Sequence, residues 1–278
     1  MLTYQDFCQR QGLSFSLQLS VLSPDLSTLF TTSGMQKHKH LFSSSDSFGT
    51  LTDIQRCLRL NDLEEIGDGT HYLDFHMLGL FSFKDWTVPQ SVRFWMSFLK
   101  EIHCLPDTVT IHPNKPDWRH FYDKYDVLVK EDPECLWSDG SIGGYCTEFY
   151  KEGVEIGNIV NPLGHSIDCG FGMERLECFI STLPLPSYKD ILERTILLLL
   201  ESGVIPSNTK QGYVLRKLIR IGLEHNIQVS HPFIEKEKQR IEQLQQKIEG
   251  LLKKYPNRPK EFYWETFGVD ITEKFLKQ

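Results

Sequence analysis

Hydrophobic and polar residues alternate in several short segments of the first 180 residues, which is typical of β-strands that bury one face. The clearest case is "DIQRCLRL" at 53–60. The apolar, glycine-containing stretch "HMLGLFSFKDW" at 76–86 predicts a buried strand or turn. We expect further strands at 26–35 (running into a turn), 107–113, 125–131, 153–161 and 166–170.

Apolar residues recur at helical spacing in other parts of the chain. A short helix is expected at 3–12, ending at Gly12, and a longer one at 89–103, with Pro89 in its first turn. After Met173 the pattern becomes helical to about residue 180. Helices are also expected at 188–202, 211–225 and 233–254.

The order of these elements predicts an α+β fold. Strands outnumber crossover helices before residue 180, which favours an antiparallel sheet flanked by helices over a doubly wound one. Helices alone follow. The proline-containing stretch "TLPLPS" at 182–187 resembles a linker, so we expect a first domain over 1–181 and a helical domain over 182–278. Neither a dinucleotide fingerprint nor a phosphate-binding P-loop occurs.

Composition predicts a soluble globular protein, with 40% hydrophobic and 24% charged residues. Seven cysteines without a C-x-x-C pair predict neither a zinc site nor a disulfide framework, and they favour a reducing, cytoplasmic location. No signal peptide opens the chain, and the aliphatic run at 195–200 is too short to span a bilayer, so no membrane association is expected.

Charge is distributed unevenly along the chain. The net charge is −7, yet segment 209–260 holds twelve Lys and Arg residues against five acids. An acidic body joined to basic helices indicates either two functional surfaces or simply solvated helix faces.

The densest chemistry lies in "DCGFGMER" at 168–175. Gly170 and Gly172 would let a flat ligand approach the backbone, since no Cβ intrudes. Arg175, in the first turn of a following helix, is suited to phosphate, and Asp168 is suited to an ammonium group. Together they fit a site for ATP and an amino acid. A glycine-rich turn with an exposed arginine is the alternative.

This block resembles motif 3 of the alanyl-tRNA synthetase family, which belongs to the class II aminoacyl-tRNA synthetases. Other blocks resemble the same family in the same order. They are "LFTTSGMQKHKHLF" (29–42), "QRCLRLNDLEEIGDGTHYLDFHMLGLFSF" (55–83), "VEIGNIV" (154–160) and "PSNTKQGYVLRKLIR" (206–220). The resemblance implies a class II synthetase-type sheet followed by a reduced helical domain, with ATP and Mg²⁺ used to activate alanine or a similar small amino acid.

The resemblance also implies roles for individual residues. Arg59 would contact the α-phosphate and the carboxylate, and Arg175 the outer phosphates. Phe75, Gly170 and Gly172 would border the adenosine. Asp168 would hold the substrate ammonium, with the alanine pocket formed by Trp137, Asn158 and Val160. Glu155 is a candidate Mg²⁺ ligand or a solvated strand-edge residue.

Several features depart from the family pattern. The motif 2 loop lacks "GGKH", so Arg59 is followed at once by "LNDLE". The loop "GSIGGYCTE" at 140–148 keeps only Cys146 and Glu148 of its counterpart. His76 replaces a glutamate, and we expect a structural role for it. No editing-domain histidine–cysteine pattern occurs, and "HKH" at 38–40 is expected to be a solvated turn.

Three functions remain open. The first is activation of alanine with transfer to tRNA, for which Asn208, Arg216, Lys217 and Arg220 are candidate contacts. The second is a synthetase-like ligase that passes the aminoacyl group to a carrier protein or a small molecule. The third is a non-catalytic paralogue that binds tRNA or a protein partner.

Overall fold

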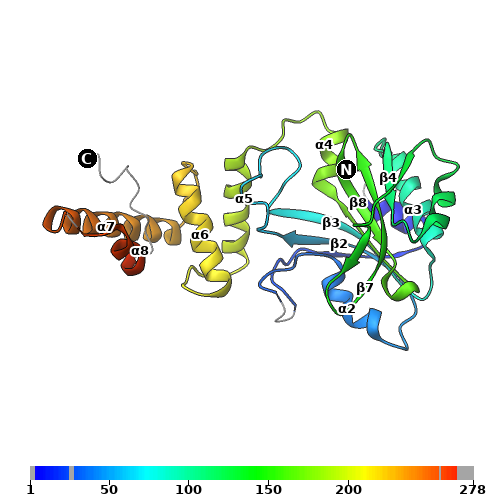
Figure 1. Ribbon diagram of the computed structural model, residues 1–278, viewed down its shortest axis with the longest axis horizontal. Helices are drawn as coiled ribbons and strands as arrows, with labels where there is room; N and C mark the ends of the chain where they lie inside the picture. The colour runs from blue at the N-terminus through cyan, green and yellow to red at the C-terminus, as the bar shows by residue number, and fades with distance from the viewer. Residues whose placement is uncertain (1–3, 25–27, 257, 268–278) are drawn as a thin grey trace. The chain divides into compact units, whose positions relative to one another are not determined.

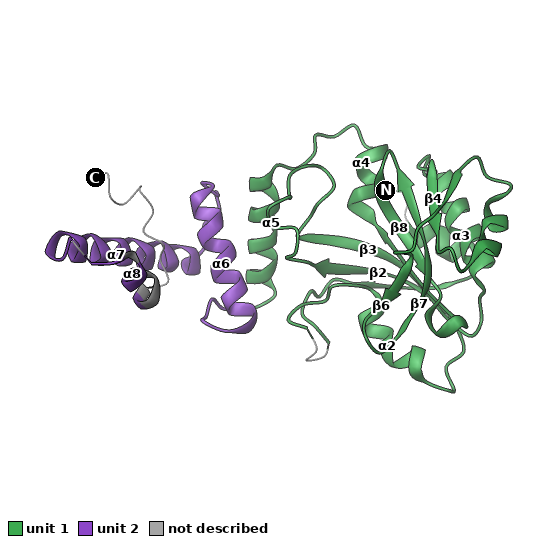
Figure 2. Cartoon of the chain, viewed as in Figure 1, with its two compact units in different colours: residues 1–203 green, residues 204–278 purple. Residues whose placement is uncertain are grey.

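The computed structural model describes residues 4–24, 28–256 and 258–267. The chain divides into two compact units, residues 1–203 and 204–278 (Figure 2). The first contains the sheet and the second contains helices, so the predicted change from mixed to all-helical structure is present. In the described residues, none of the helices has the length and apolar character needed to cross a membrane.

A nine-stranded sheet forms the first unit, in the order β1-β2-β3-β9-β8-β7-β4-β5 with β6 paired to β7 (Figure 1). Its inner pairs are antiparallel, and only the edge pairs β1·β2 and β4·β5 are parallel. The predicted antiparallel α+β class is therefore confirmed. The strands are β1 Ser14–Gln18, β2 Gly49–Leu58, β3 Asp74–Phe83, β4 Thr108–Ile111, β5 Leu128–Glu131, β6 Leu136–Ser138, β7 Gly143–Lys151, β8 Val154–Val160 and β9 Ser166–Gly172.

One face of the sheet is covered by helices. The helical elements are α1 Tyr4–Arg10, α3 Val88–Glu101, the 3₁₀ helix η1 Pro116–Tyr122 and α4 Met173–Ile180, and each contributes apolar residues to the main core. Trp95 of α3 stacks on Phe171 of β9 with ring centroids 3.9 Å apart. The start of α3 is fixed by a capping box between Thr87 and Gln90 and by a proline in its first turn.

Residues Met35–Ser43 form helix α2. This helix includes residues 38–40, where a solvated turn was expected. That expectation was wrong: His38 is buried, and its Nε2 lies 3.0 Å from Asp53 Oδ2 on β2. The predicted strand at 26–35 is also absent from residues 28–34, where Phe30 makes only an isolated bridge with Leu22. Residues 25–27 lie outside the described part of the chain.

Helix α5, Tyr188–Glu201, belongs to the first unit because Asp74 of β3 anchors it. Asp74 Oδ1 accepts hydrogen bonds from Arg194 Nε at 3.1 Å and from Thr195 Oγ1 at 2.7 Å. Asp74 Oδ2 lies 2.8 Å from Arg56 Nη2. The division between the units thus follows α5, whereas the expected domain boundary at 181/182 precedes it.

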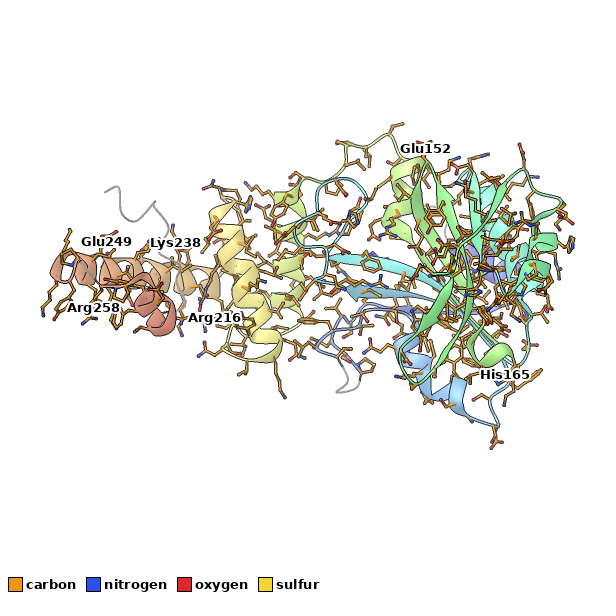
Figure 3. All side chains as sticks on the ribbon, in the orientation of Figure 1. Glu152, His165, Arg216, Lys238, Glu249 and Arg258 are labelled. Atoms are coloured by element: carbon orange, nitrogen blue, oxygen red, sulfur yellow. The ribbon has the colours of Figure 1, made fainter. Side chains whose placement is uncertain are left out.

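The second unit contains α6 Lys210–Glu224, α7 Pro232–Lys254 and α8 Lys260–Phe267. Arg216 of α6 (labelled in Figure 3) is buried. It is paired with Glu237 of α7, Nε to Oε1 at 3.0 Å. An apolar cluster centred on Ile248 and Tyr263 joins α7 to α8.

Candidate functional site

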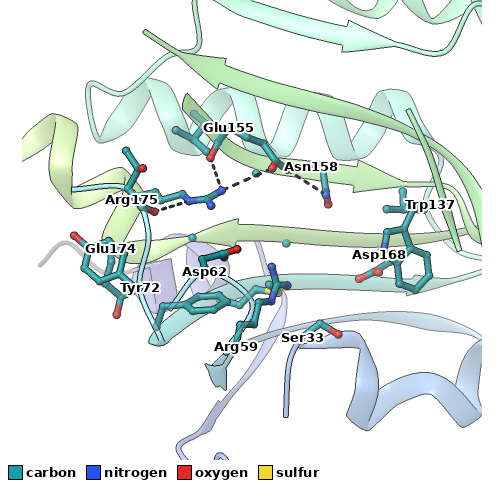
Figure 4. Close-up of a pocket in the computed structure, with 18 residues that line it drawn as sticks. Ser33, Arg59, Asp62, Tyr72, Trp137, Glu155, Asn158, Asp168, Glu174 and Arg175 are labelled. Carbon is teal, nitrogen blue, oxygen red and sulfur yellow. Dashed lines mark hydrogen bonds and ion pairs between the residues drawn. The ribbon is translucent and has the colours of Figure 1, made fainter. Parts of the chain in front are cut away.

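A cleft that opens to solvent lies in the first unit, on the sheet face opposite the main core. The lining residues come from the start of β3, from β6, β8 and β9, from the first turn of α4, and from loop residues at 33 and 59–72. They are Ser33, Arg59, Asp62, Thr70, Tyr72, Phe75, Met77, Trp137, Glu155, Ile156, Gly157, Asn158, Val160, Asp168, Gly170, Gly172, Glu174 and Arg175 (Figure 4).

Strand β9 forms the floor of this cleft because its residues alternate between the two faces. Ile167, Cys169 and Phe171 point into the core and are almost fully buried. Asp168, Gly170 and Gly172 therefore face the cleft. A Cβ added at Gly170 would lie 3.0 Å from Met77 Sδ, so glycine keeps the floor open at this point.

Arg59 follows the end of β2 and is held by two contacts. Its Nε donates to the backbone carbonyl of Thr32 at 2.8 Å, and its guanidinium lies 5.1 Å from the centroid of the Phe75 ring. It forms no ion pair with the part of the chain that the structure describes. The Arg59 guanidinium is thus positioned, and its charge is free for an anionic ligand.

Arg175, in the first turn of α4, enters the cleft from the other side (Figure 4). Its Nε donates to the carbonyl of Thr70 at 3.1 Å and its Nη1 to the carbonyl of Glu155 at 2.9 Å. The Glu155 carboxylate lies 3.7 Å from Nη1 and also accepts from Asn158 Nδ2 at 3.4 Å. Two backbone contacts orient this second cation toward the cleft.

Asp168 supplies the negative charge at the far end of the cleft. Within the described residues no group donates a hydrogen bond to it. Burial raises the pKa of Asp168 to about 7, and the Asp53 carboxylate contributes in the same direction. A ligand ammonium placed here would satisfy the carboxylate and favour its ionised form.

The wall beside Asp168 is small and apolar. Val160 of β8 pairs with Asp168 in the sheet register and is buried. Trp137 of β6 packs beside Val160 against Cys135 and Cys146. Asn158, two residues before Val160, presents an amide to the same cleft. This end suits a short side chain.

His76 is bound to Glu174, which itself lines the cleft. Glu174 Oε2 accepts the backbone N–H of His76 at 2.8 Å, and Glu174 Oε1 lies 2.9 Å from His76 Nδ1. His76 therefore orients a carboxylate of the site, which agrees with the structural role expected for it.

The fold brings every residue expected to bind the amino acid, ATP or Mg²⁺ into this one cleft; their roles remain predictions. Sequence reasoning missed Ser33, Asp62, Thr70, Tyr72, Met77, Ile156, Gly157 and Glu174. Strand alternation with Phe75 could have identified Met77, and Glu174 stands inside the motif 3 block. The residues before β3 lie in a loop whose path no local pattern predicts.

The candidate RNA contacts lie in the second unit and differ in exposure. Lys217, Arg220 and Asn208 are exposed. Arg216 is buried, hydrogen-bonded to Asn208 and paired with Glu237. Arg216 thus holds α6 to α7. A buried side chain does not suit the phosphate contact that was expected of it.

Chemically, the cleft places two positioned guanidinium groups across from each other over a glycine floor, with a carboxylate at one end that has no hydrogen-bond donor in the described part of the chain. Such an arrangement can align an anion-rich nucleotide and an ammonium-bearing acid with each other.

A family model described as class II (A) tRNA synthetases matches residues 2–158. Curated alanine–tRNA ligases are similar over most of the chain. The ligase of Buchnera aphidicola is 27% identical over 91% of this chain and 40% of its own length. The ligase of Legionella pneumophila is 28% identical over 81% of this chain and 35% of its own length. That of Desulfitobacterium hafniense is 27% identical over 76% of this chain and 33% of its own length. The chain thus spans well under half the length of these relatives.

Solved structures with some likeness include an aspartyl-tRNA synthetase from Entamoeba histolytica, with 11% identity, a TM-score of 0.40 and coverage of 68% of this chain and 55% of that one. A pyrrolysyl-tRNA synthetase from Desulfitobacterium hafniense has 14% identity, a TM-score of 0.32 and coverage of 65% and 71%.

Proposed function

The chain belongs to the class II tRNA synthetase family, and we propose that it activates a small amino acid, alanine in the first instance, as the aminoacyl-adenylate. The observation that carries the proposal is the convergence of Arg59, Arg175 and Asp168 on one cleft with a glycine floor. The similarity to alanine–tRNA ligases supports alanine as the substrate.

Asp168 would hold the substrate ammonium, since it lies free at the end of the cleft beside a small apolar wall. Val160 and Trp137 would limit the side chain to about the size of a methyl group. A missing methyl or an added hydroxyl in such an apolar pocket is worth only about 1–3 kcal/mol, so glycine and serine should compete weakly.

The reaction needs no protein base, because the amino-acid carboxylate is ionised at neutral pH. A carboxylate oxygen attacks the α-phosphorus of ATP, the bond to the bridging oxygen breaks, and pyrophosphate leaves. Arg59 would neutralise charge at the α-phosphate and align the carboxylate, and Arg175 would bind the outer phosphates. Phe75, Gly170 and Gly172 would border the adenosine.

The donor set of the cleft also fits Mg²⁺, which binds oxygen ligands and uses few protein carboxylates when it bridges phosphates. Glu155 would hold it, because its carboxylate faces the cleft beside Arg175. When bound, the ion would neutralise phosphate charge.

The acceptor of the aminoacyl group is the second part of the proposal. Lys217 and Arg220 are exposed on α6, which supports contact with tRNA. We take this contact to occur in the cytoplasm. One observation favours a carrier protein or a small-molecule acceptor instead: Asp62, an acid, lines the cleft only three residues after Arg59, where RNA phosphates would approach.

The test is amino-acid-dependent ATP–pyrophosphate exchange with each of the twenty amino acids. Exchange with alanine and weak exchange with serine and glycine are expected. Exchange that is faster with leucine, or absent with every amino acid, would contradict the proposal. Adding tRNA, with acid-gel detection of aminoacyl-tRNA, then decides between the two acceptors.

A further inference from the structure

Three potential metal ligands gather behind the Trp137 wall of the cleft. They are Cys135, just before β6, and Cys146 and Glu148 on β7. Their two sulfur atoms and a carboxylate oxygen all lie within 4.8 Å of one another, and both cysteines are buried. None of the three takes part in the proposed activation chemistry.

The backbone fixes this convergence. Cys146 and Glu148 are two residues apart on β7, so their side chains leave the same face of the strand. The N–H of Cys146 donates to the carbonyl of Cys135 at 2.9 Å, which places Cys135 directly beside Cys146.

Neighbouring groups orient the carboxylate. Glu148 Oε2 accepts hydrogen bonds from Tyr150 at 2.7 Å and from Thr110 Oγ1 at 3.5 Å. Oε1 faces Cys146 Sγ at 3.9 Å. A tetrahedral zinc ion bound at about 2.3 Å to sulfur and about 2.1 Å to oxygen would separate the two atoms by about 3.6 Å. The arrangement resembles a ligand carboxylate with its outer hydrogen bonds in place.

The cluster also lacks a positive charge. Glu148 forms no ion pair within the described residues. The charged groups that act on it, Glu155 and Asp132, are acids. A bound cation would supply the missing charge.

We propose that Cys135, Cys146 and Glu148 bind a divalent transition-metal ion, with Zn²⁺ the best match to two thiolates and one carboxylate. The fourth position would be taken by water. The spacing of the two cysteines is unlike a C-x-x-C pair, which is why the sequence predicted no zinc. Trp137 packs against both cysteines and Val160, so the ion would fix the wall of the amino-acid end of the cleft.

The test is metal content and cobalt substitution, and it requires no enzymatic activity. The chain is purified without a metal-affinity tag, dialysed, and analysed for zinc by mass spectrometry. It is then stripped and titrated with Co²⁺. We expect one ion per chain, with intense tetrahedral d–d bands and a thiolate-to-cobalt charge-transfer band.

Variants assign the ligands. Cys135→Ser and Cys146→Ser should remove the charge-transfer band, and Glu148→Gln should weaken Co²⁺ affinity at least tenfold. Cys104→Ser, which removes a buried cysteine elsewhere in the core, should leave the spectrum unchanged.

Three results would overturn the proposal. One is a wild-type chain without stoichiometric zinc and without a thiolate–cobalt band. A second is a band that Cys104→Ser removes equally. The third is thiol titration of the unfolded chain showing Cys135 and Cys146 joined in a disulfide. The wild-type spectrum alone can refute the proposal, so the test still holds if a variant fails to fold.

Discussion

Asp168 on β9 and Asp53 on β2 are carboxylates on the same face of the sheet, flanking β3, and within the described residues only Asp53 has a hydrogen-bonding partner. His38 Nε2 lies 3.0 Å from Asp53 Oδ2, whereas no described group donates to Asp168. Gly79 leaves the space that Asp53 fills, since a Cβ there would lie 2.6 Å from Asp53 Oδ1. Burial, and to a lesser extent the charge of Asp53, raise the pKa of Asp168.

Amino-acid binding should consequently depend on pH near neutrality. A ligand ammonium requires ionised Asp168, and the pKa of Asp168 in the free protein is about 7. Affinity should be full above this pH and should fall as the pH drops below it, by up to about tenfold per unit. Asp53→Asn should move this fall to lower pH, and Asp117→Asn, an exposed control, should not.

Calorimetric titration with alanine in buffers of different ionisation enthalpy measures the affinity and the protons released. If the affinity stays constant from about pH 8 to pH 6, Asp168 is not the ammonium partner or its pKa is not raised.

The sequence predicted most helices and strands because their periodicities were strong. Residues 167–171 alternate between core and cleft as their pattern indicates, and α4 begins at Met173 as expected. The prediction that Arg59, Asp168 and Arg175 share one site came from the order of the sequence blocks that resemble the synthetase family. Local pattern alone would not have joined β2 to β9, because the two strands meet only through β3.

The features that were missed depend on long-range contacts. His38 was read as a solvated residue, but it is buried and its Nε2 lies 3.0 Å from Asp53 Oδ2, on another element. Arg216 was assigned to RNA because its charge is visible in the sequence, whereas its burial depends on Glu237 of α7. The Cys135–Cys146 neighbourhood likewise arises from pairing of β6 with β7.

Arg59→Ala and Arg175→Ala should each reduce alanine-dependent pyrophosphate exchange by about a hundredfold or more. Each variant loses a positioned positive charge at the reacting phosphates. Removing one hydrogen-bond donor from an oxyanion hole raises the activation free energy by about 3 kcal/mol, and we expect a similar cost here. Arg119→Ala, which removes an exposed arginine paired with Glu131, serves as the control and should retain full exchange. Wild-type exchange rates in Arg59→Ala would show that its assigned role is wrong.

Gly170→Ala should weaken substrate binding more than it weakens the fold. The new Cβ would lie 3.0 Å from Met77 Sδ, so the methionine must move into the cleft. We expect the KM for ATP or alanine to rise about tenfold while thermal unfolding changes little. Adding Met77→Val should recover part of the loss, because it shortens the side chain that was displaced. If the double variant is no better than Gly170→Ala, the floor is not limited by Met77.

The basic residues of the second unit should separate into structural and RNA-binding groups. Arg216→Ala should destabilise the unit by up to about 3–5 kcal/mol, because it removes the buried partner of Glu237 and leaves that carboxylate only Arg240, at 3.4 Å. Lys217→Glu with Arg220→Glu should leave stability nearly unchanged and weaken tRNA binding, since both side chains are exposed. The slope of log affinity against log salt should fall by about 2, roughly one unit for each lost phosphate contact.

Lys236→Glu with Lys238→Glu is the matched control, because it makes the same charge change at exposed positions of α7. Gel-shift titrations of tRNA at two salt concentrations, beside thermal unfolding of each variant, make the measurement. Equal losses in both double variants would mean that the α6 face has no special role and that only net charge matters. Pyrophosphate exchange should be the same in all these folded variants, because Arg59, Arg175 and Asp168 lie in the first unit. A chain that exchanges pyrophosphate but shows no shift at low salt would hand its aminoacyl group to an acceptor other than tRNA.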